Sequence, residues 1–184
     1  MKITFLIADF NLPGGGERAI SNLASALYRR YSYQTEILSI QDLAENLPFK
    51  PDPAVTVGSL KINLKGKGVL AKLVSRIVSV VAVHSELRGK KIDYLLGVGV
   101  YPSVLMATLP RRRSLVRIAC EHNAWTAAPL IWQILRKATY CRLEGLVVLT
   151  KKDLELVGEQ YRNIFSIPNA RSFYPEYPTN VRKT

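Results

Sequence analysis

Three consecutive glycines near the start of the chain lie where they could bind an anion. The apolar run from Lys2 to Phe10 predicts a buried strand, after which residues 11–13 lead into Gly14-Gly15-Gly16-Glu17-Arg18. Apolar residues spaced three and four apart follow at once and predict a helix. A strand, a glycine loop and a helix in this order bring free backbone N–H groups toward a ligand, and glycine permits its close approach. The sequence therefore predicts a phosphate- or sugar-binding loop.

Glu17 and Arg18 flank this loop at the start of the predicted helix. Both residues are candidate ligand contacts. The alternative is a carboxylate favoured by the helix dipole together with a surface ion pair, which contributes about 0.3–1 kcal/mol.

The glycine loop also partly matches a dinucleotide-binding fingerprint. It lacks the lysine and the Ser/Thr of a phosphate-binding P-loop, but Gly14-x-Gly16-x-x-Ala19 fits the dinucleotide pattern, and Asp42 follows at a suitable distance to hold a ribose. The residues from Asp9 to Pro13 make a longer loop than the tight turn of that fingerprint. A dinucleotide-binding Rossmann domain of an oxidoreductase therefore stays open as an alternative.

Strand and helix patterns alternate along the whole chain. The expected strands cover 3–8, 34–40, 54–57, 92–98, 115–120, 146–149 and 164–167, and the expected helices cover 17–30, 69–87, 102–109, 129–143 and 151–160. Apolar strands separated by helices predict an α/β fold, Rossmann-like and doubly wound, with a mainly parallel sheet covered by helices on both faces. Residues 1–172 form this domain, and 173–184 read as a linker toward an absent second domain.

Small and polar residues recur directly after the predicted strands. Because ligands of such sheets bind beyond the carboxyl ends of the strands, these residues are candidate substrate contacts. They are Gly97, Gly99, His122, Asn123, Thr150 and Asn169. Thr150 is also a predicted helix cap, with Asp153 three residues later. The run Arg111–Arg113 precedes a strand, so it is expected as a solvated turn at the opposite edge.

The chain of 184 residues carries a net charge of +12, which favours anionic partners. Its basic residues are dispersed and match no nucleic-acid-binding motif, so we expect no specific nucleic acid partner. No cluster with metal-ligand spacing is present in the sequence, so we expect no metal site and no cofactor. Cys120 ends an apolar run and is expected as a buried thiol, and the N-terminus lacks the features of a signal peptide. We therefore expect a cytoplasmic protein.

The predicted helix 69–87 has a broad apolar face that allows two interpretations. Leu70, Leu73, Val74, Ile77, Val80, Val81 and Leu87 form this face, and Lys65, Lys67, Lys72, Arg76 and Arg88 lie beside it or just before it. Packing in the core, with basic side chains reaching out to water, is the favoured interpretation. The alternative is an amphipathic helix that lies on an anionic membrane surface, at the inner face of the membrane.

Several segments, taken in order, resemble family 4 glycosyltransferases of the two-domain GT-B fold. Pro-Gly-Gly-Gly-Glu-Arg resembles that family's GG-x-ER loop, and residues 19–27 resemble its first helix. The resemblance continues in Glu121-His122-Asn123, in Leu146–Leu154 and in Ser166-Ile167-Pro168-Asn169. The fold implied by the resemblance is one half of a GT-B fold, the N-terminal or acceptor-side domain.

The resemblance also implies a function. The full-length protein would be a retaining glycosyltransferase of the hexosyltransferase type, moving a sugar from a nucleotide-diphosphate sugar to a glycan or lipid-linked acceptor of a cell-surface polysaccharide. Gly15 and Gly16 would offer N–H groups near the donor phosphate, and His122 would contact the donor sugar as the catalytic residue.

The donor nucleotide would be held by a C-terminal domain, because no glutamate of this chain has another eight positions on, as that family's E-x7-E pair requires. The chain alone is therefore expected to be inactive. A non-catalytic subunit that docks a separate donor-binding chain is a further alternative.

Overall fold

The computed structural model describes residues 1–64, 68–158, 160, 161 and 163–169. The linker expected at 173–184 and the positions of Lys65 and Lys67 lie outside this range. The strands are β1 Lys2–Ile7, β2 Gln34–Ser39, β3 Thr56–Ser59, β4 Tyr94–Val98, β5 Val116–Cys120, β6 Gly145–Val148 and β7 Ile164–Ser166. The helices are α1 Gly15–Tyr31, α2 Val69–Leu87, α3 Val100–Thr108, α4 Leu130–Thr139 and α5 Lys151–Val157, with short 3₁₀ turns at Trp125–Ala127 and Tyr140–Arg142.

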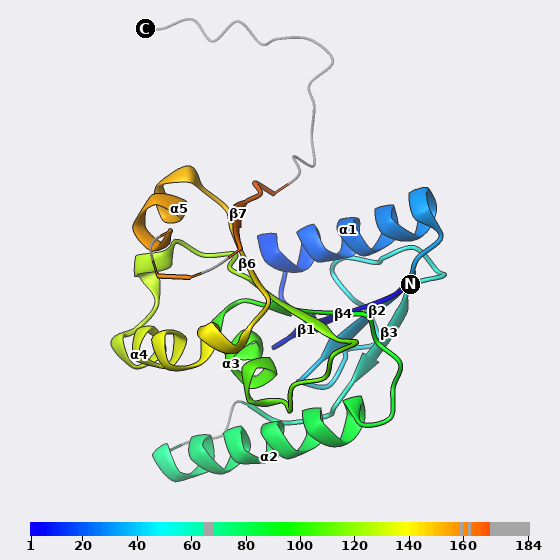
Figure 1. Ribbon diagram of the computed structural model, residues 1–184. Helices are drawn as coiled ribbons and strands as arrows, with labels where there is room; N and C mark the ends of the chain where they lie inside the picture. Colours follow the sequence, from blue (N-terminus) through cyan, green and yellow to red (C-terminus); the bar gives the residue numbers. More distant parts are fainter. Residues whose placement is uncertain (65–67, 159, 162, 170–184) are drawn as a thin grey trace, which may run out of the picture.

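All seven strands form one parallel sheet in the order β3-β2-β1-β4-β5-β6-β7 (Figure 1). In β1, Phe5 pairs with Ile37 of β2 on one side and with Leu96 of β4 on the other. This is the doubly wound arrangement expected from the sequence, and the winding reverses between β1 and β4. A ligand crevice is expected outside the carboxyl ends of these two strands.

Apolar side chains fill both faces of the sheet. Phe5 of β1 packs with Ile20 of α1, whereas Leu6 packs with Val83 of α2 and Met106 of α3. Alternate residues of one strand thus contribute to two different cores, as a strand buried on both faces requires. Accordingly, α1 covers one face of the sheet, and α2 and α3 cover the other (Figure 1).

The boundaries of four helices differ from the expected ones, and α1 begins at Gly15 and ends at Tyr31. α3 begins at Val100, before Pro102, because Gly99 with φ +82° turns the chain directly into the helix. α4 ends at Thr139, and the expected continuation to Leu143 is a 3₁₀ turn. α5 ends at Val157 rather than at Gln160.

The core-packing interpretation of the helix 69–87 is wrong for part of its apolar face, of which the side chains of Leu70 and Leu73 lie outside the described residues. Val74, Ile77 and Val81 are 51%, 58% and 63% exposed, and Val78 is exposed beside them. Among the described side chains of α2, Val83 and Leu87 enter the core, Val80 and Ala82 pack against it, and the small polar Ser79 is buried. The spacing of apolar residues identified the helix, but it could not show that α2 has only one face against the sheet.

Candidate functional site

The loop after β1 is held in place by one buried carboxylate. Asp9 Oδ1 accepts hydrogen bonds from the Asn11 backbone nitrogen at 3.1 Å and from Asn11 Nδ2 at 2.7 Å, and Oδ2 accepts one from Gln41 Nε2 at 3.0 Å. Asn11 in turn bonds the backbone of Asp42 and Ala44. These bonds fix the extra residues before the glycines, so the loop is longer than a dinucleotide turn and is ordered.

Asp42 belongs to this framework. Its Oδ1 accepts hydrogen bonds from the Leu43 backbone nitrogen at 2.9 Å and from Ser59 Oγ at 3.0 Å. Asp42 thus ties the segment after β2 to the end of β3, which gives it a structural role that needs no ribose.

The three glycines lie at the N-terminus of α1, each in a different environment. A Cβ on Gly14 would collide with the carboxylate of Glu17, which folds back over it. A Cβ on Gly15 would have no neighbour within 4 Å, and one on Gly16 would lie 3.6 Å from Cγ of His122. Gly14 is the N-cap of α1 and provides no side-chain cap, while the Glu17 carboxylate accepts a hydrogen bond from its own backbone N–H. The N–H groups of Gly15 and Gly16 are therefore the candidate donors to a ligand.

Glu17 is half-buried, and Arg18 is exposed. Burial raises the pKa of Glu17, and the nearby Asp9 adds to the increase, while a backbone hydrogen bond opposes it.

His122 meets the glycine loop across the carboxyl edge of the sheet. Among the described residues, neither Nδ1 nor Nε2 has a hydrogen-bond partner within bonding geometry, although both atoms are buried. Burial lowers the pKa of His122, and a hydrogen bond with the side chain of Asn169, which follows β7, opposes that decrease. The structure thus brings Gly16, His122 and Asn169 together, and burial favours the neutral form of the imidazole.

The other predicted site residues have local structural roles. Gly97 is required by packing, because a Cβ there would lie 2.7 Å from Cα of Ser103 in α3. Gly99 provides the positive φ at the start of α3. Thr150 caps α5 as expected and accepts a hydrogen bond from the Asp153 backbone nitrogen at 3.0 Å. Asn123 is exposed at the same edge, directly after His122.

A buried charged network that the sequence did not reveal supports the loop of His122. Arg136 and Glu121 are each 1% exposed at the side chain, and Arg136 Nη2 donates to Glu121 Oε2 at 3.3 Å. Tyr140 donates a short hydrogen bond to the other oxygen of Glu121. Arg136 Nη1 also donates to the Trp125 carbonyl at 2.7 Å, and its guanidinium lies 4.2 Å from the Trp125 ring centroid.

This network fixes both sides of the loop that carries His122. Asp153 completes it, because Oδ1 accepts a hydrogen bond from the Trp125 backbone nitrogen at 2.9 Å. The available signal was the spacing of Trp132, Arg136 and Tyr140, which lie four residues apart along α4 and into the 3₁₀ turn that follows it. Burial raises the pKa of Glu121, while the charge of Arg136 and the hydrogen bond from Tyr140 oppose the increase.

Two further expectations from the sequence are confirmed. Cys120 is buried, and burial raises the pKa of its thiol to about 12, so it is unreactive. Arg111, Arg112 and Arg113 are exposed at the edge opposite the candidate site. Within the described part of the chain, no three acidic, histidine or cysteine side chains are placed to hold a metal ion.

The chain is similar to known glycosyltransferases. No family model matches it. It is 29% identical over 154 residues to an α-1,4-N-acetyl-D-galactosaminyltransferase of Campylobacter jejuni. The name of that protein specifies GalNAc-α-(1→4)-GalNAc-α-(1→3)-diNAcBac-PP-undecaprenol. The aligned residues make up 83% of this chain and 41% of that protein.

Two solved structures show the same fold. Sucrose-phosphate synthase from Thermosynechococcus elongatus has a TM-score of 0.69 at 11% identity, covering 91% of this chain and 48% of that one. The lipopolysaccharide outer core galactosyltransferase WaaB has a TM-score of 0.67 at 13% identity, and the match covers 95% of this chain and 47% of that one. The resemblance to GT-B glycosyltransferases is thereby confirmed, and the chain spans less than half the length of each of the three proteins.

We expect Arg136→Met to destabilise the fold by about 3–5 kcal/mol, because it leaves Glu121 buried without its counter-charge. Without Arg136 the pKa of Glu121 rises further above its ordinary value of 4.5. The folded variant then binds a proton that the unfolded chain releases, so its stability is greatest below that ordinary pKa and falls as the pH rises through the folded pKa.

Urea unfolding at several pH values measures this effect. Lys137→Met removes the same charge from an exposed position of α4 and should change stability little. Adding Glu121→Gln to Arg136→Met should remove the pH dependence. Equal stability losses for the two single variants at every pH would contradict the account.

Proposed function

We propose that the chain is the acceptor-side domain of a glycosyltransferase that moves a sugar from a nucleotide-diphosphate sugar to a glycan or lipid-linked acceptor in cell-surface polysaccharide synthesis. The observation that carries the proposal is the contact between the glycine loop at the N-terminus of α1 and the buried imidazole of His122. The similarity to a transferase that is named for an undecaprenol-linked diphosphate supports it.

The proposed chemistry divides between the two sides of this contact. The free N–H groups at Gly15 and Gly16, aided by the helix dipole, stabilise negative charge as it develops on the leaving diphosphate. His122 is neutral, so it accepts or donates a hydrogen bond to a hydroxyl of the transferred sugar and orients it. Asn169 and Asn123 add polar contacts at the same edge. A second domain holds the nucleotide, and the reaction retains the anomeric configuration.

The proposal includes reversible docking on an anionic membrane surface through α2. Val74, Ile77, Val78 and Val81 form an exposed apolar stripe on this helix, and the chain has a net charge of +12. Each basic residue close to an anionic leaflet contributes about 1 kcal/mol, and the stripe adds burial of apolar surface. In the described part of the chain, none of the helices is both long and apolar enough to span a bilayer.

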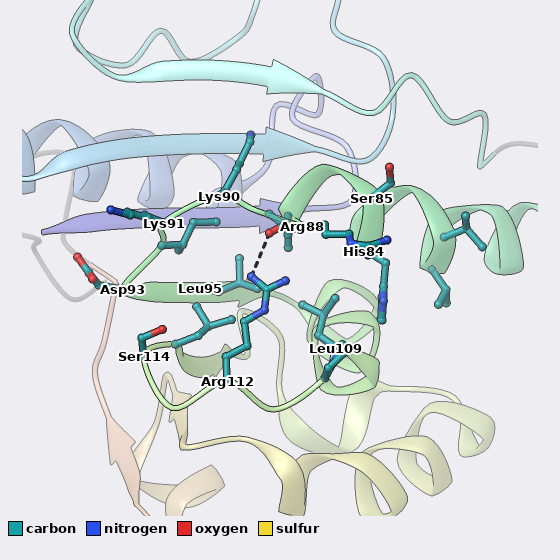
Figure 2. Close-up of a pocket in the computed structure, with 16 residues that line it drawn as sticks. His84, Ser85, Arg88, Lys90, Lys91, Asp93, Leu95, Leu109, Arg112 and Ser114 are labelled. Carbon is teal, nitrogen blue, oxygen red and sulfur yellow. Dashed lines mark hydrogen bonds between the residues drawn. The ribbon is translucent and has the colours of Figure 1, made fainter.

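A basic cavity at the C-terminal end of α2 also supports docking on an anionic surface through this helix. This cavity of about 920 Å³ lies between α2 and the segments before β4 and β5, at the edge opposite the candidate site (Figure 2). Arg112 extends across it and donates to the Leu87 carbonyl at 3.3 Å. His84, Arg88 and Lys91 also line the cavity, and Val81 belongs both to its wall and to the apolar stripe. The cationic side chains of the cavity therefore adjoin the apolar stripe of α2 at Val81.

Kinetics of the full-length protein test the glycosyltransferase site. We expect His122→Ala to lower kcat on the order of 10²-fold, since it removes a group that contacts the reacting sugar. Thermal unfolding of the variant checks that the loss of turnover is measured on folded protein. Unchanged turnover would remove His122 from the mechanism.

Gly15→Val tests the loop independently. The new side chain meets no protein atom within 4 Å of its Cβ, so the variant should fold, yet the side chain blocks the approach of the donor diphosphate and raises KM for the donor. Ala26→Val adds a β-branched side chain at an exposed position of the same helix and should leave the kinetics normal. Wild-type kinetics for Gly15→Val would contradict the loop assignment.

Sedimentation with vesicles tests the docking surface. We expect the protein to bind vesicles that contain phosphatidylglycerol and to lose this binding in Ile77→Glu and in Val81→Glu, because each buries a charge against the membrane. Leu156→Glu makes the same change at an exposed leucine of α5 and should not affect binding. Equal binding by all variants would exclude α2 as the docking surface.

A further inference from the structure

Arg76 of α2 packs against two aromatic rings and has no ionic partner among the described residues. Its guanidinium carbon lies 3.9 Å from the ring centroid of Tyr101 and 4.9 Å from that of Trp132. The two rings meet edge to face, with centroids 5.7 Å apart. Among the described residues, none accepts a hydrogen bond from Arg76 Nη1, although this atom is buried. The rings therefore fix the direction of a guanidinium whose charge no described residue neutralises.

The same place contains two more buried donors without partners. A cavity of about 380 Å³ is lined by Arg76, Tyr101 and Trp132, and also by Arg136, Asn123 and Ala8. Arg136 Nε and the Tyr101 hydroxyl lack hydrogen-bond partners in the described structure, as Arg76 Nη1 does. A buried polar group that stays unpaired costs about 1–3 kcal/mol, and more if it is charged. Three such groups around one cavity indicate a ligand that accepts hydrogen bonds.

The charges around the cavity define the class of ligand. Two arginines and no carboxylate are among the described residues that line it. Arg136 has its charge partner in Glu121, whereas Arg76 has none in the described structure. A guanidinium stays protonated at any physiological pH and presents its N–H groups as a fork that fits a carboxylate or a phosphate. A neutral sugar ring would leave the charge of Arg76 unbalanced.

The position of the cavity relates it to the proposed reaction. Ala8 follows β1, and Asn123 follows His122, so the cavity lies at the carboxyl edge where the sheet reverses its winding. We propose that this cavity is an acceptor subsite that binds an oxyanion, a phosphate or a carboxylate of the acceptor, through Arg76, Tyr101 and Arg136 Nε. The acceptor part of this inference rests on the proposed function; the oxyanion site itself does not.

Isothermal titration of the full-length protein tests the subsite. The probes are inorganic pyrophosphate and D-glucuronate, with D-glucose as the neutral control, and UDP is present to occupy a donor site. We expect at least one oxyanion to bind, and Arg76→Gln to weaken its Kd about 10- to 100-fold, as loss of a charged hydrogen bond does. Arg30→Gln removes the same charge from an exposed position of α1 and should keep the wild-type Kd.

Tyr101→Phe gives a second test that does not depend on the folding of the Arg76 variant. It keeps the ring under Arg76 and removes only the unpaired hydroxyl, so oxyanion binding should weaken several-fold without loss of thermal stability. Tighter binding of pyrophosphate than of glucuronate identifies the acceptor group as a phosphate, and the reverse order identifies a carboxylate.

Three results would overturn the inference: no oxyanion binding, equal Kd values for wild type and Arg76→Gln, or glucose binding as tight as that of glucuronate. Sugar transfer is measured in a separate assay, so the oxyanion subsite and the proposed function can be refuted independently. A protein that binds the oxyanion through Arg76 but transfers no sugar would refute the proposed function and leave the subsite in place.

Discussion

The parallel direction of all seven strands determines where the functional groups of this chain lie. Because every strand ends at the same edge, the glycine loop after β1, the His122 loop after β5 and Asn169 after β7 meet there, although more than 150 residues separate the first from the last. The reversal of winding between β1 and β4 opens the edge at that point. The opposite edge carries the arginine turn and the basic cavity.

Within this frame, the buried pair of Arg136 and Glu121 connects the candidate site with the proposed acceptor subsite. Its charge-assisted bonds hold the Trp125 carbonyl and the start of the His122 loop, while the free Nε of Arg136 faces the cavity that Arg76 lines. A buried charge that is moved away from its partner costs several kcal/mol, so this pair restricts the position of the loop more strongly than apolar packing alone would. One arginine can thus fix the geometry of two neighbouring binding regions.

The sequence predicted the sheet well and the site only in part. Apolar strands and helical spacing gave the fold, and strand ends indicated Gly16, His122 and Asn169 as neighbours, because topology decides which strand ends meet. Arg76 and Arg136 were not recognisable as site residues, since a basic residue on a helix is usually solvated and only the packing of α3 and α4 encloses these two. The exposed stripe of α2 was also ambiguous, because periodicity does not show how much of a helix the sheet covers.

Transfer of a sugar by the full-length protein is the most direct test of the central claim that this domain belongs to a working glycosyltransferase. Mass spectrometry of an undecaprenyl-diphosphate-linked glycan, incubated with the protein and with each of several nucleotide-diphosphate sugars, measures it. The account predicts that one of these donors increases the acceptor mass by a single sugar residue. No product with any donor, together with NADH binding that depends on the glycine loop, would contradict it and favour a dinucleotide-binding domain.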